Sequence, residues 1–95
     1  MVVGVLRVEL RLEAVRSLKE KRGLVQKILA RCRNRFPVSA AEVGDQDLWG
    51  NAVLGFAMVS SSEPLVAGHL ERLEDEIESS GLAEIVSAEV EYIHL

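Results

Sequence analysis

Apolar and polar residues alternate at the start of the chain, from residue 4 to residue 12. The even-numbered positions after Gly4 are apolar, and the positions between them carry charges at Arg7, Glu9 and Arg11. A period of two is typical of a β-strand with one buried face. Three later segments are also predicted as strands: residues 38–43, 52–60 and 84–93. The run AVLGFAMVS at 52–60 is apolar at nearly every position, which is typical of a central strand covered on both faces.

Two other segments have the three- to four-residue spacing of amphipathic helices. The first is predicted to begin after Ser17, whose hydroxyl can cap the first turn while Glu20 reaches back to the cap, and to stop at Pro37. The second is predicted to follow a cap at Ser61 or Ser62 and to end at Gly81. Each helix therefore has one apolar stripe to bury.

The order strand, helix, strand, strand, helix, strand fits into a chain of 95 residues. This length is enough for one domain with one core. The order is that of the split βαβ pattern. We therefore predict an α+β fold, a ferredoxin-like βαββαβ sandwich over residues 1–95, in which a four-stranded antiparallel sheet carries both helices on one face.

Charge is divided sharply along the chain, although the formal net charge is only -4. Residues 1–36 hold ten basic and three acidic side chains, whereas residues 37–95 hold one basic and twelve acidic side chains. The first helix is therefore predicted to be basic on its outer face and the second acidic, which makes the molecule an electric dipole.

The basic helix has two interpretations. It can bind a polyanion, since phosphates favour clustered cations, or it can be a solvated face that pairs with acids on the second helix. The candidate nucleic-acid-binding residues are Arg16, Lys19, Lys21, Arg22, Lys27, Arg31 and Arg35. Neither the first nor the third predicted strand contains the aromatic-interleaved basic motif with which ordinary single-strand RNA-recognition domains stack bases. Contact through phosphates and shape, as on ribosomal RNA, is therefore the expectation.

Two further surfaces are candidates for partner binding. The small apolar residues Val3, Val5, Val53 and Ala57 are predicted on the open sheet face, where they favour either homodimerisation or an ordinary, partly exposed sheet. Trp49, in the turn between the second and third strands, can either anchor a partner or, as we favour, fold back to seal the edge of the core.

Catalytic chemistry has little support in the residues. Cys32 falls on the apolar stripe of the first helix, where a core role is expected although nearby arginines could lower its pKa. Asp45 and Asp47 alone are weak support for a cation site. The chain has no His/Cys ligand set, base–nucleophile pair, P-loop or GxGxxG. A phosphate-handling enzyme using Asn51 or Arg16 stays as the least favoured alternative, so no catalytic residue, metal or cofactor is predicted.

A cytoplasmic location is the expectation. No apolar run reaches the roughly 20 residues that cross a bilayer, and charges interrupt the opening segment where a signal peptide needs an apolar stretch. The single cysteine agrees with a reducing compartment. We therefore expect no membrane partner.

Four blocks together resemble the YlxP-like family of small uncharacterised bacterial proteins: VGVLRVEL, RSLKEKR, RNRFPVSAAEV and DQDLWGNAVLG. The resemblance implies a ferredoxin-like fold, a bacterial cytoplasmic setting and genes often placed beside those of translation-initiation and ribosome-maturation factors. It implies no established reaction. The expected function is thus that of a non-enzymatic translation- or ribosome-associated accessory protein that binds rRNA through the first helix. The alternative is a homodimeric protein-interaction or small-molecule-sensing module that uses the open sheet face and the Trp49 turn.

Overall fold

Six elements follow one another in the computed structural model, which describes residues 1–95. They are β1 (Val2–Arg11), α1 (Leu18–Arg35), β2 (Ser39–Gly44), β3 (Asn51–Ser60), α2 (Glu63–Ser79) and β4 (Glu84–His94). The predicted βαββαβ order is confirmed. The bounds differ by one or two residues, because the ends of an element depend on its neighbours as well as on its own periodicity.

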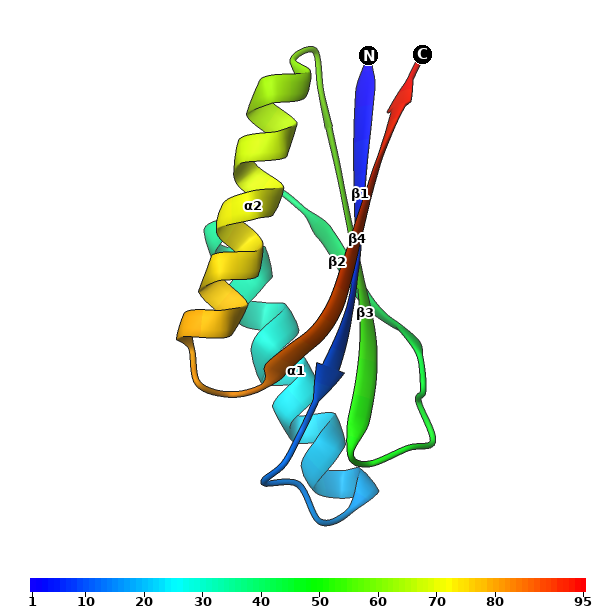
Figure 1. Cartoon of the computed structure of the whole chain (residues 1–95), viewed down its shortest axis with the longest axis vertical. Coiled ribbons are helices and arrows are strands. Elements are labelled where there is room, and N and C mark those ends of the chain that lie inside the picture. The colour runs from blue at the N-terminus through cyan, green and yellow to red at the C-terminus, as the bar shows by residue number, and fades with distance from the viewer.

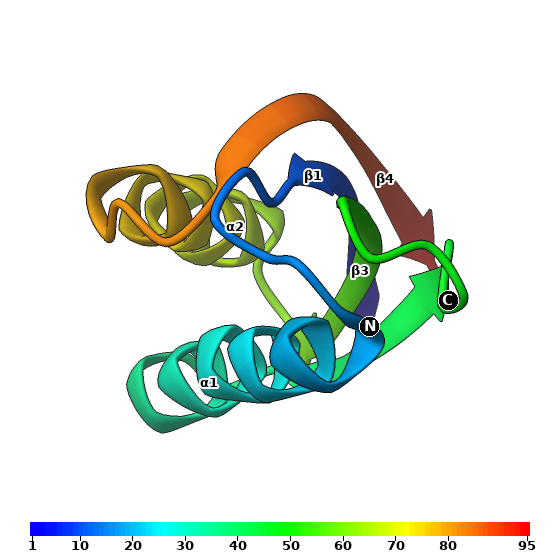
Figure 2. The ribbon, with the colours of Figure 1, turned by 90° about the horizontal axis from the view of Figure 1, so that it is seen from below.

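The strands form one four-stranded antiparallel sheet in the order β2-β3-β1-β4. Seen from below, α1 and α2 both lie on the same face of the sheet and leave the other face open, which confirms the two-layer arrangement (Figure 2). The two chain termini lie side by side at one end (Figure 1). There the Leu95 amide donates to the Met1 carbonyl at a nitrogen–oxygen distance of 2.8 Å.

The core lies between the sheet and the two helices. The apolar alternate positions of β1 and β3 point into it, and the register places Leu6 opposite Phe56 and Val8 opposite Leu54, all of them buried. Both helices complete the core with their predicted stripes, whose buried members are Val25, Ile28, Leu29, Cys32, Val66, Leu70, Leu73 and Ile77. Neither helix is long and apolar enough to cross a membrane.

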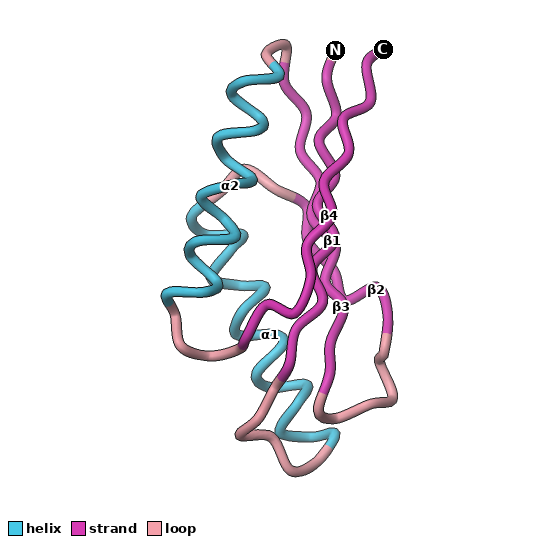
Figure 3. Tube along the Cα trace, viewed as in Figure 1, coloured by secondary structure: helices cyan, strands magenta, loops and turns pink.

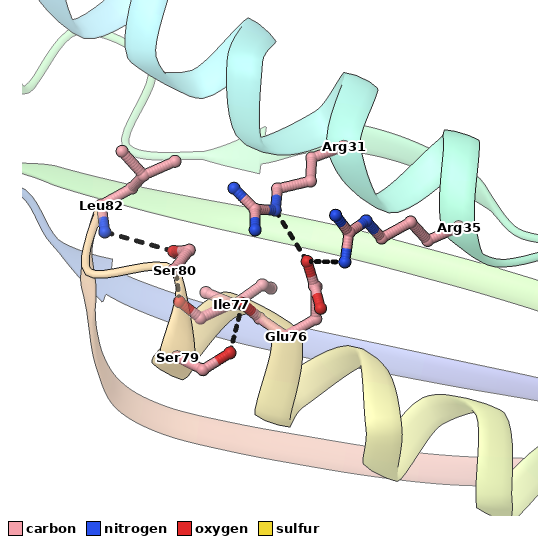
Figure 4. Close-up of polar contacts among 7 residues, drawn as sticks. All are labelled: Arg31, Arg35, Glu76, Ile77, Ser79, Ser80 and Leu82. Atoms are coloured by element: carbon pink, nitrogen blue, oxygen red, sulfur yellow. Dashed lines mark hydrogen bonds and ion pairs between the residues drawn. The ribbon is translucent and has the colours of Figure 1, made fainter.

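The helix starts largely follow the predicted capping chemistry. The Ser17 hydroxyl accepts a hydrogen bond from the Glu20 amide at 3.1 Å, and Ser62 caps α2 in the same way. The Glu20 carboxylate reaches back to the Arg16 amide at 3.0 Å rather than to the Ser17 amide. At the other end of α2, the Ser80 hydroxyl donates to the Ile77 carbonyl (Figure 4), and the chain then turns through Gly81 at a φ of 72°.

Candidate nucleic-acid interface

The seven predicted basic residues occupy different environments. Arg31 and Arg35, in the C-terminal half of α1, face α2 and share one carboxylate oxygen (Figure 4). The Arg31 Nε atom lies 2.7 Å from Glu76 Oε1, and the Arg35 Nη1 atom lies 2.9 Å from the same oxygen. For these two arginines, the structure confirms the predicted pairing with an acid of the second helix.

Lys21 is in a different position from the one predicted for an RNA-binding residue. Its side chain is only 1% exposed, and its Nζ atom lies 3.0 Å from Glu42 Oε2 on β2 and donates to the Asp45 carbonyl. A lysine enclosed in this way cannot reach a phosphate, so Lys21 leaves the candidate set. Its spacing to Val25 and Ile28, four and seven residues later, already placed it on the apolar stripe.

The remaining predicted cations are exposed and form no ion pair. Arg33 shares these properties; it donates only to the Ala40 carbonyl, and it stands eleven residues, about three helical turns, after Arg22 on the same side of α1. Arg33 is not among the binding residues predicted from the sequence. These five residues, hereafter the α1 cation patch, are Arg16, Lys19, Arg22, Lys27 and Arg33.

Helix α2 carries the opposite charge beside this patch. Burial is the main cause of a raised pKa at Glu74, and repulsion from the neighbouring carboxylates of Asp75, Glu71 and Glu78 adds to it. This accumulation of negative charge repels a polyanion, whereas the α1 cation patch attracts one. The dipole predicted from the sequence is thus arranged across the two helices of one layer.

Glu76 is expected to stabilise the fold only at pH values where it is ionised. The hydrogen bond from Arg31 is the largest cause that lowers the pKa of Glu76 below 4.5. A group with a lowered folded-state pKa contributes stability that is present above the unfolded value and lost as the pH falls through the folded value. We therefore expect Glu76→Gln to lower the unfolding free energy at pH 7 and to match the parent chain in strong acid.

Urea unfolding of both proteins between pH 7 and pH 2 measures this difference. Glu78→Gln is the matched control, because Glu78 is exposed on the same helix and forms no ion pair. A Glu76→Gln effect that did not depend on pH would contradict an electrostatic role.

Cys32 is a core residue, as favoured from the sequence. It is 1% exposed, and burial, with a smaller contribution from Glu76, raises its pKa to about 11; the opposing attraction of Arg31 is weaker. Because one pKa unit is a factor of ten in the thiolate fraction, the native thiol should have roughly a hundred-fold less thiolate at pH 8 than an ordinary one.

Alkylation of Cys32 by iodoacetamide at pH 8 should therefore be at least about a hundred-fold slower in the native protein than in the urea-unfolded chain. A raised folded-state pKa also means that the associated stability is present below pH 9.0 and lost as the pH rises toward about 11. Rapid alkylation of the native protein would contradict the burial of this thiol.

The open sheet face holds most of the predicted partner-binding residues. Val3, Val5 and Ala57 are half-buried there, and Val59 beside them is 60% exposed. Val53 differs, since only 3% of it is exposed and the last residue of β2 passes so close that a Cβ at Gly44 would lie 3.2 Å from the Val53 side chain. Val53 therefore cannot be a direct contact for a partner, because the β2 bulge, which the sequence does not reveal, covers it.

Trp49 does not seal the core, which corrects the interpretation favoured from the sequence. It is 49% exposed, and with Leu48 it forms one wall of a hollow of about 630 Å³. The opposite wall comes from the segment between β1 and α1, including Glu13 and Val15. Figure 3 shows that this segment, the β2–β3 loop and the start of α1 gather at the end of the molecule opposite the termini.

No three His, Cys, Asp or Glu side chains converge in a group that could hold a metal ion. Asp45, one of the two carboxylates considered from the sequence, adopts a left-handed φ of 56° in a tight turn, and its carbonyl accepts from the Leu48 amide at 3.0 Å. Asn51, considered for phosphate chemistry, lines the hollow beside Trp49.

Residues 3–90 match a family described as a protein of unknown function (DUF503). The chain is also similar to the uncharacterized protein YlxP of Bacillus subtilis (strain 168), with 46% identity over 57 residues, which are 60% of this chain and 62% of that protein. The chain thus aligns with less than two thirds of that relative. These matches confirm the resemblance noted in the sequence.

Two solved structures are similar in fold. A structural genomics protein, YJCS, has a TM-score of 0.56 and 12% identity over 97% of this chain and 99% of its own. The de novo designed protein Foldit4 has a TM-score of 0.52 and 18% identity over 99% of this chain and 97% of its own. At such low identity the likeness concerns the arrangement of elements alone.

Proposed function

This chain belongs to the DUF503 family of proteins of unknown function, and we propose that it is a non-enzymatic, translation- or ribosome-associated accessory protein of the bacterial cytoplasm. It binds rRNA through the α1 cation patch. The observation that supports this most directly is that five exposed basic side chains, on α1 and just before it, form no ion pair, although acidic residues are abundant elsewhere in the chain.

Electrostatic repulsion among the cations of the patch is the physical reason to expect a bound polyanion. Like charges on one surface repel, and this chain pairs Arg31 and Arg35 with Glu76 on the neighbouring helix, whereas the acid nearest the patch in sequence, Glu20, accepts from the Arg16 amide and forms no ion pair. A polyanion gains from such a patch because each neutralised phosphate releases condensed counterions. The gene context that the family resemblance implies, beside translation factors, makes ribosomal RNA the preferred polyanion.

The test is co-sedimentation of the purified protein with ribosomal subunits at low and near-physiological salt. Binding should weaken as salt rises, with a slope of log K against log salt of about -3.5 to -4.5 if all five cations meet phosphates. Lys19→Glu and Arg22→Glu should each weaken binding, and the double variant should abolish it at near-physiological salt.

Arg72→Glu is the matched control, because it makes the same change of charge at an exposed arginine on α2, away from the patch. It should leave binding within about two-fold. Binding that is insensitive to salt, or that Arg72→Glu weakens as much as Arg22→Glu, would count against the proposal.

A homodimer formed through the open sheet face is the second candidate, as part of a protein-interaction or small-molecule-sensing module. The specific observation in its favour is that Val59 and Ile93, 60% and 42% exposed, extend the apolar surface of Val3, Val5 and Ala57 on that face. Surfaces of this kind often mark contacts between copies of a protein. Sedimentation equilibrium should then show a dimer that Val59→Glu dissociates; a monomer at all concentrations would remove this candidate.

A further inference from the structure

We propose that the hollow beside Trp49 is a stacking site for an unpaired nucleobase, and that it takes a base from an RNA strand whose phosphates lie on the α1 cation patch. This inference rests on the proposed function and adds a second, chemically different contact to it. Stacking would occur at the end of the molecule and not on the sheet, where RNA-recognition domains of this general fold usually place their aromatic residues.

The hollow has the size and the wall that a base needs. Its volume of about 630 Å³ lies within the range of roughly 300–1,000 Å³ found for small-molecule sites. Trp49 and Leu48, which line it, are 49% and 51% exposed, while Leu12 and Val15, which also line it, are buried. An aromatic ring held at an open cavity is the feature on which single-stranded nucleic acids stack their bases.

Backbone contacts hold the loop that carries Trp49 on both sides. At its start, the Asp45 carbonyl accepts from the buried Lys21 ammonium and from the Leu48 amide at 3.0 Å. At its end, the Gly50 carbonyl accepts from the Leu12 amide at 2.9 Å. A ring presented by a restrained loop loses less conformational freedom on binding than a mobile one, which favours affinity.

The charges around the hollow orient a strand. Glu13 lines it and Asp47 is two residues from Trp49, while the one cation in the lining, Arg11, lies 3.4 Å from its partner Glu84 Oε2. A phosphate inside the hollow would therefore meet carboxylates and no unpaired cation. A neutral base would not be repelled, and the carboxylate of Glu13 and the amide of Asn51 are groups that hydrogen-bond base edges.

The cations lie just outside the hollow. Arg16 and Lys19 stand at the start of α1, in the segment that runs on from Val15 in the hollow wall, and Arg22 follows Lys21, whose ammonium holds the loop. The arrangement therefore places the base in the hollow and the phosphate backbone along α1. It also selects a single strand over a duplex, because a paired base cannot leave its stack without a cost.

Trp49 is the only tryptophan, so its fluorescence reports this site alone. The probes are a single-stranded RNA of about ten nucleotides and inorganic polyphosphate, which carries the charge without bases. We expect both probes to bind the full chain and only the RNA to quench Trp49. Trp49→Ala should lower the affinity for labelled RNA about ten- to a hundred-fold, leave polyphosphate binding unchanged, and leave the circular dichroism spectrum of the folded chain intact.

The two proposals fail in different ways. If Trp49→Ala leaves RNA affinity unchanged, or weakens RNA and polyphosphate equally, the stacking site is wrong while the α1 cation patch stands. If neither probe binds the parent chain, the proposed function is wrong and the stacking site with it. Lys19→Glu with Arg22→Glu should weaken both probes, and Trp49→Phe, which keeps an aromatic face, should retain most of the RNA affinity that Trp49→Ala loses.

Discussion

Replacing Lys21 with methionine should lower the unfolding free energy by roughly 3–5 kcal/mol, the usual loss when one partner of a buried ion pair is removed. The substitution leaves Glu42 without its counterion, and the buried Oε2 atom of Glu42 has no hydrogen-bond partner beyond this ion pair. It also removes the donor that serves the Asp45 carbonyl. Urea unfolding followed by circular dichroism at pH 7 measures the loss.

Two comparisons separate this loss from a general effect of removing charge. Lys19→Met, two residues earlier on the exposed side of α1, should change stability by no more than about 0.5 kcal/mol. Lys21→Met combined with Glu42→Leu should recover much of the stability, because a well-packed apolar pair often replaces a buried ion pair without loss. An equal effect of Lys19→Met and Lys21→Met would contradict the buried pair.

Gly4→Ala should lower the unfolding free energy by roughly 3 kcal/mol, at the upper end of what overpacking a core usually costs. Gly4 lies on β1 beneath α2, where a Cβ would overlap the Val66 side chain and lie 3.0 Å from Leu70 Cδ1. Both neighbours are buried in α2, so the helix must move away from the sheet to make room. Thermal and urea unfolding of the variant measure the loss.

A rescue and a control test the cause. Val66→Ala should partly restore Gly4→Ala, because it removes the overlapping methyl groups. Gly23→Ala should instead stabilise the protein by about 0.5–1 kcal/mol, since Gly23 lies inside α1 and a Cβ there meets nothing within 4 Å. A neutral Gly4→Ala would show that α2 packs less closely on β1 than described.

Helix α1 divides its basic residues between structure and surface. Lys21 connects α1 to β2, and Arg31 and Arg35 connect it to α2. The residues of the α1 cation patch form no ion pair, and only Arg33 among them contacts another element through its side chain, at the Ala40 carbonyl of β2. Stability measurements on the first group and binding measurements on the second should therefore give separable results, which is what makes the proposed function testable by charge reversal.

The fold followed from local patterns because those patterns reflect local geometry. Alternation at Leu6, Val8 and Leu10 requires a strand with one buried face, and the spacing of Val66, Leu70, Leu73 and Ile77 requires a helix with one buried side. Ser17 and Ser62 could be predicted as caps because a cap bonds to amides only two or three residues away.

The candidate site was predicted less completely. The charges of α1 are visible in the sequence, but which of them stay free depends on acids 21 to 45 residues farther along the chain, at Glu42 and Glu76. Lys21 could have been removed from the set by its place on the apolar stripe, and Arg33 could have been added by its spacing from Arg22.

The sequence alone determined that this protein is a βαββαβ sandwich with a basic helix and an acidic helix on one face of its sheet, because strand and helix periods and caps act over a few residues. Only the tertiary structure decided that Lys21 pairs with Glu42, that Val53 is covered by a bulge and that Trp49 stands open beside a hollow. Those outcomes depend on how loops and elements distant in sequence meet. The packing of the whole sheet sets these contacts, and no local sequence pattern encodes them.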